Sequence, residues 1–148
     1  MQTRTRIVST GKYVPSKVVT NHDLEKMMDT TDEWIQQRSG IKERRWVNKD
    51  DTTLSMATAA AKEALENAKL KPDDIDMIIF GALVTDMVFP GTGCMLQHAL
   101  GMSKNTPALD VRNQCSGFVY SLQVADSLIR SGSYKKILIV GSEIHSCR

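Results

Sequence analysis

The sequence predicts an α/β fold with a mostly parallel sheet, and three observations carry this prediction. Residues 77–84 and 137–141 are continuous apolar runs, which are typical of parallel strands covered on both faces. Residues 107–109 form an extended apolar approach to Cys115. Helical apolar patterns separate these runs, and such alternation calls for helices on both faces of the sheet.

The N-terminal part predicts one strand and two short helices. Residues 7–15 read as a strand that ends in a turn marked by glycine and proline. Asn21 is the expected N-cap of a helix over residues 21–29. A second helix is expected to begin with a capping box between Thr30 and Glu33 and to end at Gly40.

Trp34 and Arg38 are separated by four positions, so on a helix they share a face. An indole beside a guanidinium is suited to hold a flat, phosphorylated ligand by stacking and charge. The alternative is a tryptophan packed in the core with an arginine stem laid over it. From these residues alone, the packed tryptophan is the favoured interpretation.

Three further helices complete the predicted elements. Residues 51–68 have helical spacing of small apolar side chains and end before a break at 71–74. A loop at residues 89–93 leads to a short helix over 94–100. The helix after Cys115 is expected to face the core through a stripe of four side chains: Phe118, Leu122, Ala125 and Ile129.

Length and composition fit one ordinary globular domain with a real core. The chain has 148 residues, 41% hydrophobic and 24% charged, with a net charge of +2. The charge is too small and dispersed to predict nucleic-acid binding, and the basic cluster at Lys42, Arg44 and Arg45 is better explained as a solvated turn. No apolar run approaches the roughly 20 residues that span a membrane. The start of the chain does not resemble a secretory signal.

The three cysteines predict a reducing, cytoplasmic location, since their number is odd and their spacing irregular. Cys94 and His98 are four positions apart, which would place two metal ligands on one helix face. Two potential ligands do not make a metal site, and His145 and Cys147 do not follow at a spacing typical of metal ligands. We therefore expect no metal and no cofactor.

Cys115 is the candidate catalytic residue. It stands between an extended segment and a helical pattern, so it is expected at the N-terminus of a helix. There the free backbone N–H groups and the positive end of the dipole favour the thiolate over the thiol. The alternative is an inert cysteine buried in the core, where free cysteines are common.

Several motifs in order carry a resemblance to a known family. They are residues 10–15 (TGKYVP), 29–35 (DTTDEWI), 38–44 (RSGIKER), 89–90 (FP) and 115–118 (CSGF). The series resembles the N-terminal half of β-ketoacyl-acyl-carrier-protein synthase III, the condensing enzyme that initiates fatty-acid synthesis.

The resemblance implies a thiolase-like fold of two similar α/β halves, with residues 1–148 as the N-terminal half that carries the nucleophile. The C-terminal half would be absent, so the sheet would lack a strand and expose an unpaired edge. The chain is therefore expected to be a fragment of a protein about twice as long.

The resemblance also implies roles for individual residues. Cys115 would take the acyl group from acyl-CoA and condense it with malonyl-acyl-carrier protein. Trp34 would stack on the CoA adenine, with Arg38 and Thr30 at the mouth of the same channel. Phe89 would reach across a homodimer to shape the partner's acyl pocket. Backbone N–H groups, including that of Cys115, would form the oxyanion hole.

Two departures from the family pattern are visible. Arg112, Asn113 and Gln114 stand where the family usually has small residues, which leaves the acyl-chain preference open. The family's catalytic His and Asn match no residue here, so the chain by itself is not expected to catalyse the condensation. Other thiolase-fold acyltransferases remain alternatives, namely enzymes like hydroxymethylglutaryl-CoA synthase or priming enzymes of polyketide or quinolone pathways. A non-catalytic partner half-domain is a third alternative, which the intact cysteine argues against.

Overall fold

The computed structural model describes residues 4–146, and they form two compact units. The larger unit contains the described part of residues 1–13 together with residues 52–145. The smaller unit is built from residues 14–51 together with Ser146. The division into two units was not predicted from the sequence.

The larger unit contains a three-stranded parallel sheet in the order β4-β3-β5. β3 (Met77–Gly81) lies in the middle and pairs with β4 (Ala108–Val111) and β5 (Ile137–Gly141). Every residue of β3 is buried, as its continuous apolar run predicts. The predicted α/β fold with a parallel sheet is therefore confirmed.

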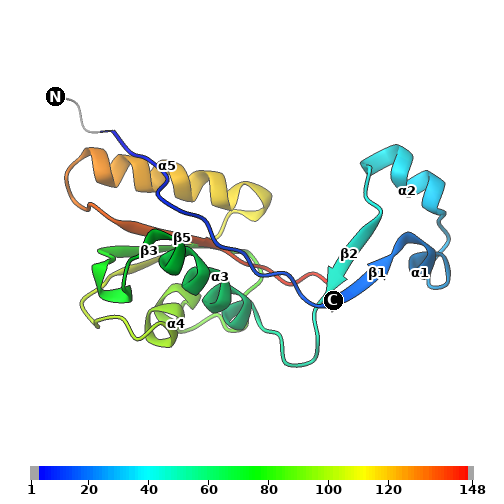
Figure 1. Ribbon diagram of the computed structural model, residues 1–148, viewed down its shortest axis with the longest axis horizontal. Coiled ribbons are helices and arrows are strands. Elements are labelled where there is room, and N and C mark those ends of the chain that lie inside the picture. The colour runs from blue at the N-terminus through cyan, green and yellow to red at the C-terminus, as the bar shows by residue number, and fades with distance from the viewer. Residues whose placement is uncertain (1–3, 147–148) are drawn as a thin grey trace. The chain divides into compact units, whose positions relative to one another are not determined.

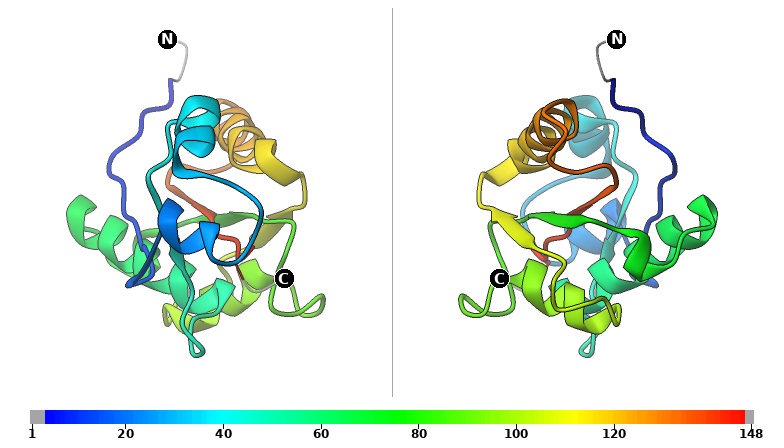
Figure 2. Two further views of the ribbon diagram at one scale, coloured as in Figure 1. Left: turned by 90° about the vertical axis from the view of Figure 1, so that its right-hand side faces the viewer. Right: turned by 90° about the vertical axis from the view of Figure 1, so that its left-hand side faces the viewer.

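Helices cover both faces of this sheet (Figures 1 and 2). α3 (Thr53–Ala68) and α4 (Thr92–Ala99) lie on one face, and α5 (Gly117–Arg130) lies on the other. Successive side chains of a strand point to opposite faces, so β3 supplies both cores. Ile78 and Phe80 pack with α3 and α4, whereas Met77 and Ile79 pack with α5.

The predicted first strand over residues 7–15 is wrong. Residues 4–13 are extended, but their hydrogen bonds to the rest of the unit are made with helix α3 rather than with a strand. The Ser9 hydroxyl donates to the Ala64 carbonyl at 2.7 Å, and Asn67 Nδ2 donates to the Thr10 carbonyl at 2.9 Å. Gly11 permits this close approach, since a Cβ there would overlap the backbone of Ala60 and Ala64.

The predicted core stripe of α5 is wrong at Phe118, whose side chain is 47% exposed. The residues of α5 that are buried against the sheet are Gly117, Ser121 and Ala125. All four side chains of the predicted stripe line an apolar groove of about 370 Å³, together with residues 5–11, α3 and β5. Of these four, only Ala125 is also fully buried. Ser121 and Gly117 occupy the contact face because they let α5 lie close to the sheet at Gly81.

The smaller unit contains a two-stranded antiparallel sheet that the sequence did not predict. β1 (Lys17–Thr20) pairs with β2 (Glu43–Trp46), and Lys17 lies opposite Trp46. The Lys17 ammonium stands 5.2 Å from the centre of the Trp46 ring, which favours this register. The four residues of β2 include three charged side chains, so they carry no apolar alternation.

Two short helices follow β1, and the N-cap of each is one residue away from the predicted cap. α1 (Asn21–Glu25) is capped by Thr20, which forms a capping box with Asp23, because the Asn21 side chain is buried and bonded elsewhere. α2 (Asp32–Ser39) is capped by Thr31, whose hydroxyl accepts from Trp34 N at 3.1 Å. Gly40 ends α2 at φ 70°, as predicted.

The capping box of α1 predicts a pH effect in the acid range. Hydrogen bonds from the Thr20 hydroxyl and backbone N–H lower the pKa of Asp23 to about 2. A lowered pKa stabilises the folded unit above the ordinary pKa of about 4. This contribution is lost as the pH falls towards about 2. We expect Thr20→Val to raise the pKa of Asp23 by about 1 in a carboxyl NMR titration. Thr58→Val, which removes a hydroxyl bonded within α3, is the matched control and should leave it unchanged.

Candidate functional site

Cys115 lies at a corner between a strand and a helix, as predicted. β4 ends at Val111, a short 3-10 turn covers Gln114–Ser116, and α5 begins directly after it. The Cys115 thiol is free and exposed. The alternative of an inert core cysteine is therefore wrong, and the thiol is open to an incoming electrophile.

Local contacts hold the backbone of this corner in an unusual conformation. Gln114, directly before the cysteine, has a φ of 36°, which costs a residue with a Cβ about 1 kcal/mol. Asn113 Nδ2 donates to the Ser116 hydroxyl at 3.2 Å across the turn. The buried Ser121 hydroxyl donates to the Gly117 carbonyl at 2.8 Å and fixes the first turn of α5. The corner is thus pre-formed around the thiol.

Phe89 belongs to the same unit and lies in the loop between β3 and α4. Its side chain is 86% exposed, and the peptide bond to Pro90 is cis. Neighbouring Val88 is 80% exposed. An exposed apolar pair in a loop is a surface suited to contact another apolar group.

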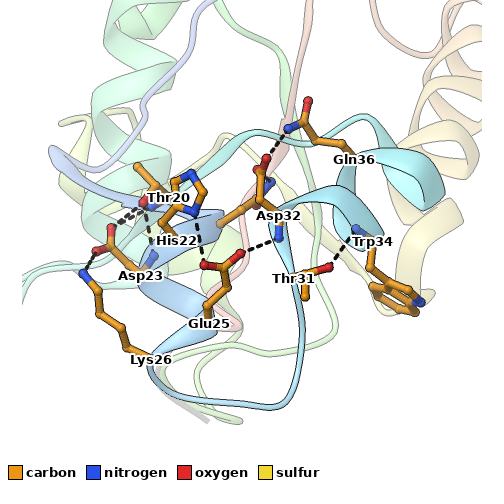
Figure 3. Close-up of polar contacts among 10 residues, drawn as sticks. Thr20, His22, Asp23, Glu25, Lys26, Thr31, Asp32, Trp34 and Gln36 are labelled. Carbon is orange, nitrogen blue, oxygen red and sulfur yellow. Dashed lines mark hydrogen bonds and ion pairs between the residues drawn. The ribbon is translucent and has the colours of Figure 1, made fainter.

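Trp34 and Arg38 lie side by side on α2 in the smaller unit. The Arg38 guanidinium carbon is 5.8 Å from the centre of the Trp34 ring. The indole is 56% exposed, and Figure 3 shows it pointing away from the polar contacts at the start of α2. The alternative of a tryptophan packed in the core is therefore wrong. The predicted pairing of an aromatic face with a cation is confirmed.

Thr30 directly precedes the cap of α2, so the predicted capping box between Thr30 and Glu33 is wrong. Thr31 is the cap because its hydroxyl, rather than that of Thr30, reaches Trp34 N. The Thr30 hydroxyl is buried and has no hydrogen-bond partner among residues 4–146. Thr30, Trp34 and Arg38 therefore belong to one stretch of the smaller unit, whereas Cys115 and Phe89 belong to the larger.

A polar network fixes the start of α2 relative to α1 (Figure 3). Glu25 Oε1 accepts from Asp32 N at 2.7 Å, and Glu25 Oε2 lies 3.1 Å from His22 Nδ1. The Asp32 N–H lowers the pKa of Glu25, with His22 adding to the effect. The Glu25 carboxylate in turn raises the pKa of His22. These contacts set where the Trp34 helix begins.

The described residues contain no cluster of three or more His, Cys, Asp or Glu side chains that could hold a metal ion. Cys94 and His98 lie on α4 without a third ligand. Cys147 lies outside the described residues. No helix within residues 4–146 is long and apolar enough to cross a membrane.

Sequence reasoning missed three polar side chains around the loop that carries Phe89. They are Asp86, Arg112 and Glu143, and each hydrogen-bonds to a partner far away in the sequence. In the sequence, Arg112 stands out only as a departure from the family pattern. No local pattern marks such partners, because they meet only in the folded chain.

Comparison with known proteins agrees with the predicted resemblance. The family model for 3-oxoacyl-acyl-carrier-protein (ACP) synthase III matches residues 109–147, which include Cys115. β-Ketoacyl-acyl-carrier-protein synthase III of Thiobacillus denitrificans is 48% identical over 141 residues, which are 95% of this chain and 44% of the relative. That of Aquifex aeolicus is 50% identical over 139 residues, which are 94% of this chain and 44% of the relative.

Solved structures show the same fold. The crystal structure of the Aquifex aeolicus synthase III superposes with a TM-score of 0.87 at 48% identity, covering 92% of this chain and 44% of that one. The priming β-ketosynthase of the R1128 polyketide pathway gives 0.87 at 32% identity, covering 92% and 40%. The predicted thiolase-like fold is confirmed, and this chain spans less than half the length of these relatives.

Proposed function

Because this chain is similar over nearly its whole length to β-ketoacyl-acyl-carrier-protein synthase III, we propose that it carries the acyl-accepting site of such a condensing enzyme. The observation that carries the proposal is the free, exposed Cys115 at a strand-to-helix corner. This corner lies inside the segment that the family model matches.

The proposed chemistry at Cys115 is acyl transfer. The thiolate sulfur attacks the carbonyl carbon of acyl-CoA, a carbon–sulfur bond to Cys115 forms, and the bond to CoA sulfur breaks. CoA leaves as its thiolate and takes up a proton. Backbone N–H groups at the corner, including that of Cys115, would stabilise the oxyanion that forms on the carbonyl oxygen.

Recognition of CoA is assigned to the smaller unit. Trp34 would stack on the adenine, and Arg38 would meet the negative charge of the nucleotide end. The exposed indole beside a guanidinium supports this assignment, since it offers a flat face and a cation together. Thr30 would lie at the mouth of the same channel, directly before the helix that carries Trp34 and Arg38.

The remaining steps are proposed for the whole protein. The malonyl group of malonyl-acyl-carrier protein is decarboxylated and condenses with the acyl group on Cys115. In this family, these steps need a His and an Asn that match no residue here. A homodimer in which Phe89 shapes the partner's acyl pocket is supported by the exposure of Phe89. A cytoplasmic location is supported by the odd number and irregular spacing of the cysteines.

A second candidate is a priming β-ketosynthase of a polyketide pathway. The similarity to the R1128 priming enzyme favours it, at 32% identity and the same TM-score as the fatty-acid enzyme. Both candidates share acyl transfer to the cysteine and differ in the acyl group accepted.

The proposal is tested by mass spectrometry of the complete protein after incubation with acyl-CoA substrates. We expect one covalent acyl adduct, mapped by peptide digestion to Cys115, that hydroxylamine removes because it is a thioester. No adduct with any of acetyl-, butyryl- and octanoyl-CoA contradicts acyl transfer. An adduct on Cys94 alone contradicts the assignment to Cys115.

A second prediction concerns Trp34. Trp34→Ala should raise the KM for acyl-CoA about tenfold and leave kcat nearly unchanged, because stacking of a base on an aromatic side chain contributes about 1–3 kcal/mol. Steady-state rates at varied acyl-CoA measure this effect. Trp34→Phe keeps an aromatic face and is the matched control. Its KM for acyl-CoA should rise about threefold or less. An unchanged KM in Trp34→Ala removes Trp34 from the CoA site.

A further inference from the structure

The loop between β3 and α4, residues 82–91, combines an exposed apolar tip with a base that is tied to the rest of the larger unit. Val88 and Phe89 form the tip and are 80% and 86% exposed. Loops of this kind are usually mobile, because few buried contacts hold them. In this loop, groups from three other places in the sequence form hydrogen bonds with residues 83–86.

Glu143 is the first tie. Its carboxylate oxygen Oε1 accepts from the backbone N–H groups of Leu83 and Val84, the latter at 3.0 Å. Its other oxygen lies 3.0 Å from His145 Nε2. Burial raises the pKa of Glu143, but the bonds from Leu83, His145 and Val84 outweigh burial and lower it overall. An ionised carboxylate therefore holds two successive amides just after β3.

Asp86 is the second tie, and it reaches out from the loop itself. Its two carboxylate oxygens accept from Thr53 N at 2.9 Å and from Leu54 N at 2.8 Å. These amides are the first two of α3, which have no partner within the helix. Negative charge is also favoured at a helix N-terminus, so the loop is anchored there.

Arg112 is the third tie, and it links the loop to the approach of the nucleophile. Arg112 Nη2 donates to the Thr85 hydroxyl at 3.0 Å. That hydroxyl donates in turn to the Met87 carbonyl at 2.8 Å, two residues before Phe89. Arg112 precedes Cys115 by three residues. The departure from small residues before the cysteine thus gives the loop a polar partner.

We propose that Arg112, Asp86 and Glu143 are positioning residues that hold the β3–α4 loop, and with it Phe89, in one place on the larger unit, from which Phe89 would reach the partner's acyl pocket. We further propose that this positioning narrows the range of acyl chains that the enzyme transfers. The inference rests on the proposed acyl transfer to Cys115. A side chain that limits an acyl pocket can discriminate between chains only if the backbone that carries it does not shift.

The Arg112–Thr85 link gives the sharpest test, because each partner can be removed separately. Acylation rates of the complete protein are measured with acetyl-, isobutyryl-, butyryl- and octanoyl-CoA. Arg112→Ala and Thr85→Val should each reduce the ratio between the fastest and slowest substrates about fivefold, the effect of one hydrogen bond. The double variant should show no larger change than either single one, because the two share one interaction.

Two variants serve as controls for this measurement. Thr85→Ser keeps the hydroxyl and should retain the wild-type ratio. Arg130→Ala makes the same chemical change as Arg112→Ala, but at an exposed ion pair with Asp126 on α5, and should also retain it. A uniform fall of all rates in Arg112→Ala and Thr85→Val would mean a merely structural role and overturns the selectivity claim.

Hydrogen exchange at the amides of residues 83–89 tests the positioning directly. Glu143→Ala should speed exchange there, whereas Glu143→Gln keeps an acceptor oxygen for Leu83 and Val84 and should restore most of the protection. Asp86→Ala is a less specific variant, because it also leaves the Thr53 and Leu54 amides of α3 without their partner. Unchanged exchange in Glu143→Ala and Arg112→Ala overturns the positioning role. A wild-type protein that no acyl-CoA acylates overturns the proposed function and the selectivity claim, whatever the exchange result.

Discussion

Replacing Cys115 by alanine is expected to abolish covalent acylation of the protein. Acyl transfer needs a sulfur nucleophile at this position, and alanine offers no sulfur to bond. The side chain is exposed, so its removal should change the free energy of unfolding by no more than about 0.5 kcal/mol. The loss of the acyl adduct would then be chemical in origin. Intact-mass spectrometry after incubation with acyl-CoA measures it.

Cys94→Ala is the matched control for this experiment. Cys94 is also a free, exposed thiol in the same unit, but it lies on α4 rather than at the strand-to-helix corner. The Cys94→Ala protein should form the adduct at the wild-type rate. An adduct that persists in Cys115→Ala would show that another nucleophile accepts the acyl group.

Replacing Asn21 by alanine is expected to destabilise the smaller unit by about 3 kcal/mol, because it leaves buried polar groups without partners. Asn21 is only 1% exposed. Its Nδ2 donates to Asp32 Oδ1 at 2.8 Å and to the Ile41 carbonyl at 2.7 Å. Its Oδ1 accepts from Arg44 Nη2 at 2.6 Å. One side chain therefore connects α1, the first residue of α2, the segment before β2, and β2 itself.

Hydrogen exchange over residues 17–46 measures this effect within the smaller unit. Asn67→Ala is the matched control, since Asn67 makes one exposed bond to the Thr10 carbonyl and should cost much less. The Asn21 amide is also the first cause of the lowered pKa of Asp32, so Asn21→Ala should raise that pKa towards its ordinary value. Unchanged exchange would mean that Asn21 is dispensable for the fold of this unit.

The stability of the smaller unit bears on function through α2, which carries Trp34 and Arg38. If Asn21→Ala loosens the start of α2 at Asp32, the indole and the guanidinium lose their fixed positions. The KM for acyl-CoA should then rise with little change in the rate of acylation at saturation. A fall in the saturated rate of acylation with an unchanged KM would contradict this prediction, because the smaller unit would then affect the acylation step and not the binding of acyl-CoA.

The sequence predicted the elements whose signals are local. Continuous apolar runs located β3 and β5, helical spacing located α3, and Gly40 marked the end of α2. The corner at Cys115 was also predicted, because a strand and a helix meet there over a few residues. Each of these features depends on neighbours within one or two turns, which a sequence pattern contains in full.

The wrong predictions share a different cause. Residues 7–15 have the pattern of a strand, but α3 is their neighbour in the fold. β2 has no apolar alternation and forms because β1 pairs with it. Asn21 has the composition of a cap, but a buried position and the Arg44 guanidinium engage its side chain instead. In each case a partner distant in sequence decided between conformations that are locally almost equal.

The sequence by itself determined the α/β class, the order of the main helices and strands, and the strand-to-helix corner that carries Cys115. Only the tertiary structure decided how the loop of Phe89 is held, through bonds such as that from Val84 N to Glu143, 59 positions away. It also decided that Trp34 lies on the surface beside Arg38. The physical reason is that periodicity and capping act along the chain, whereas buried polar pairs form only where the fold brings distant side chains within hydrogen-bond reach.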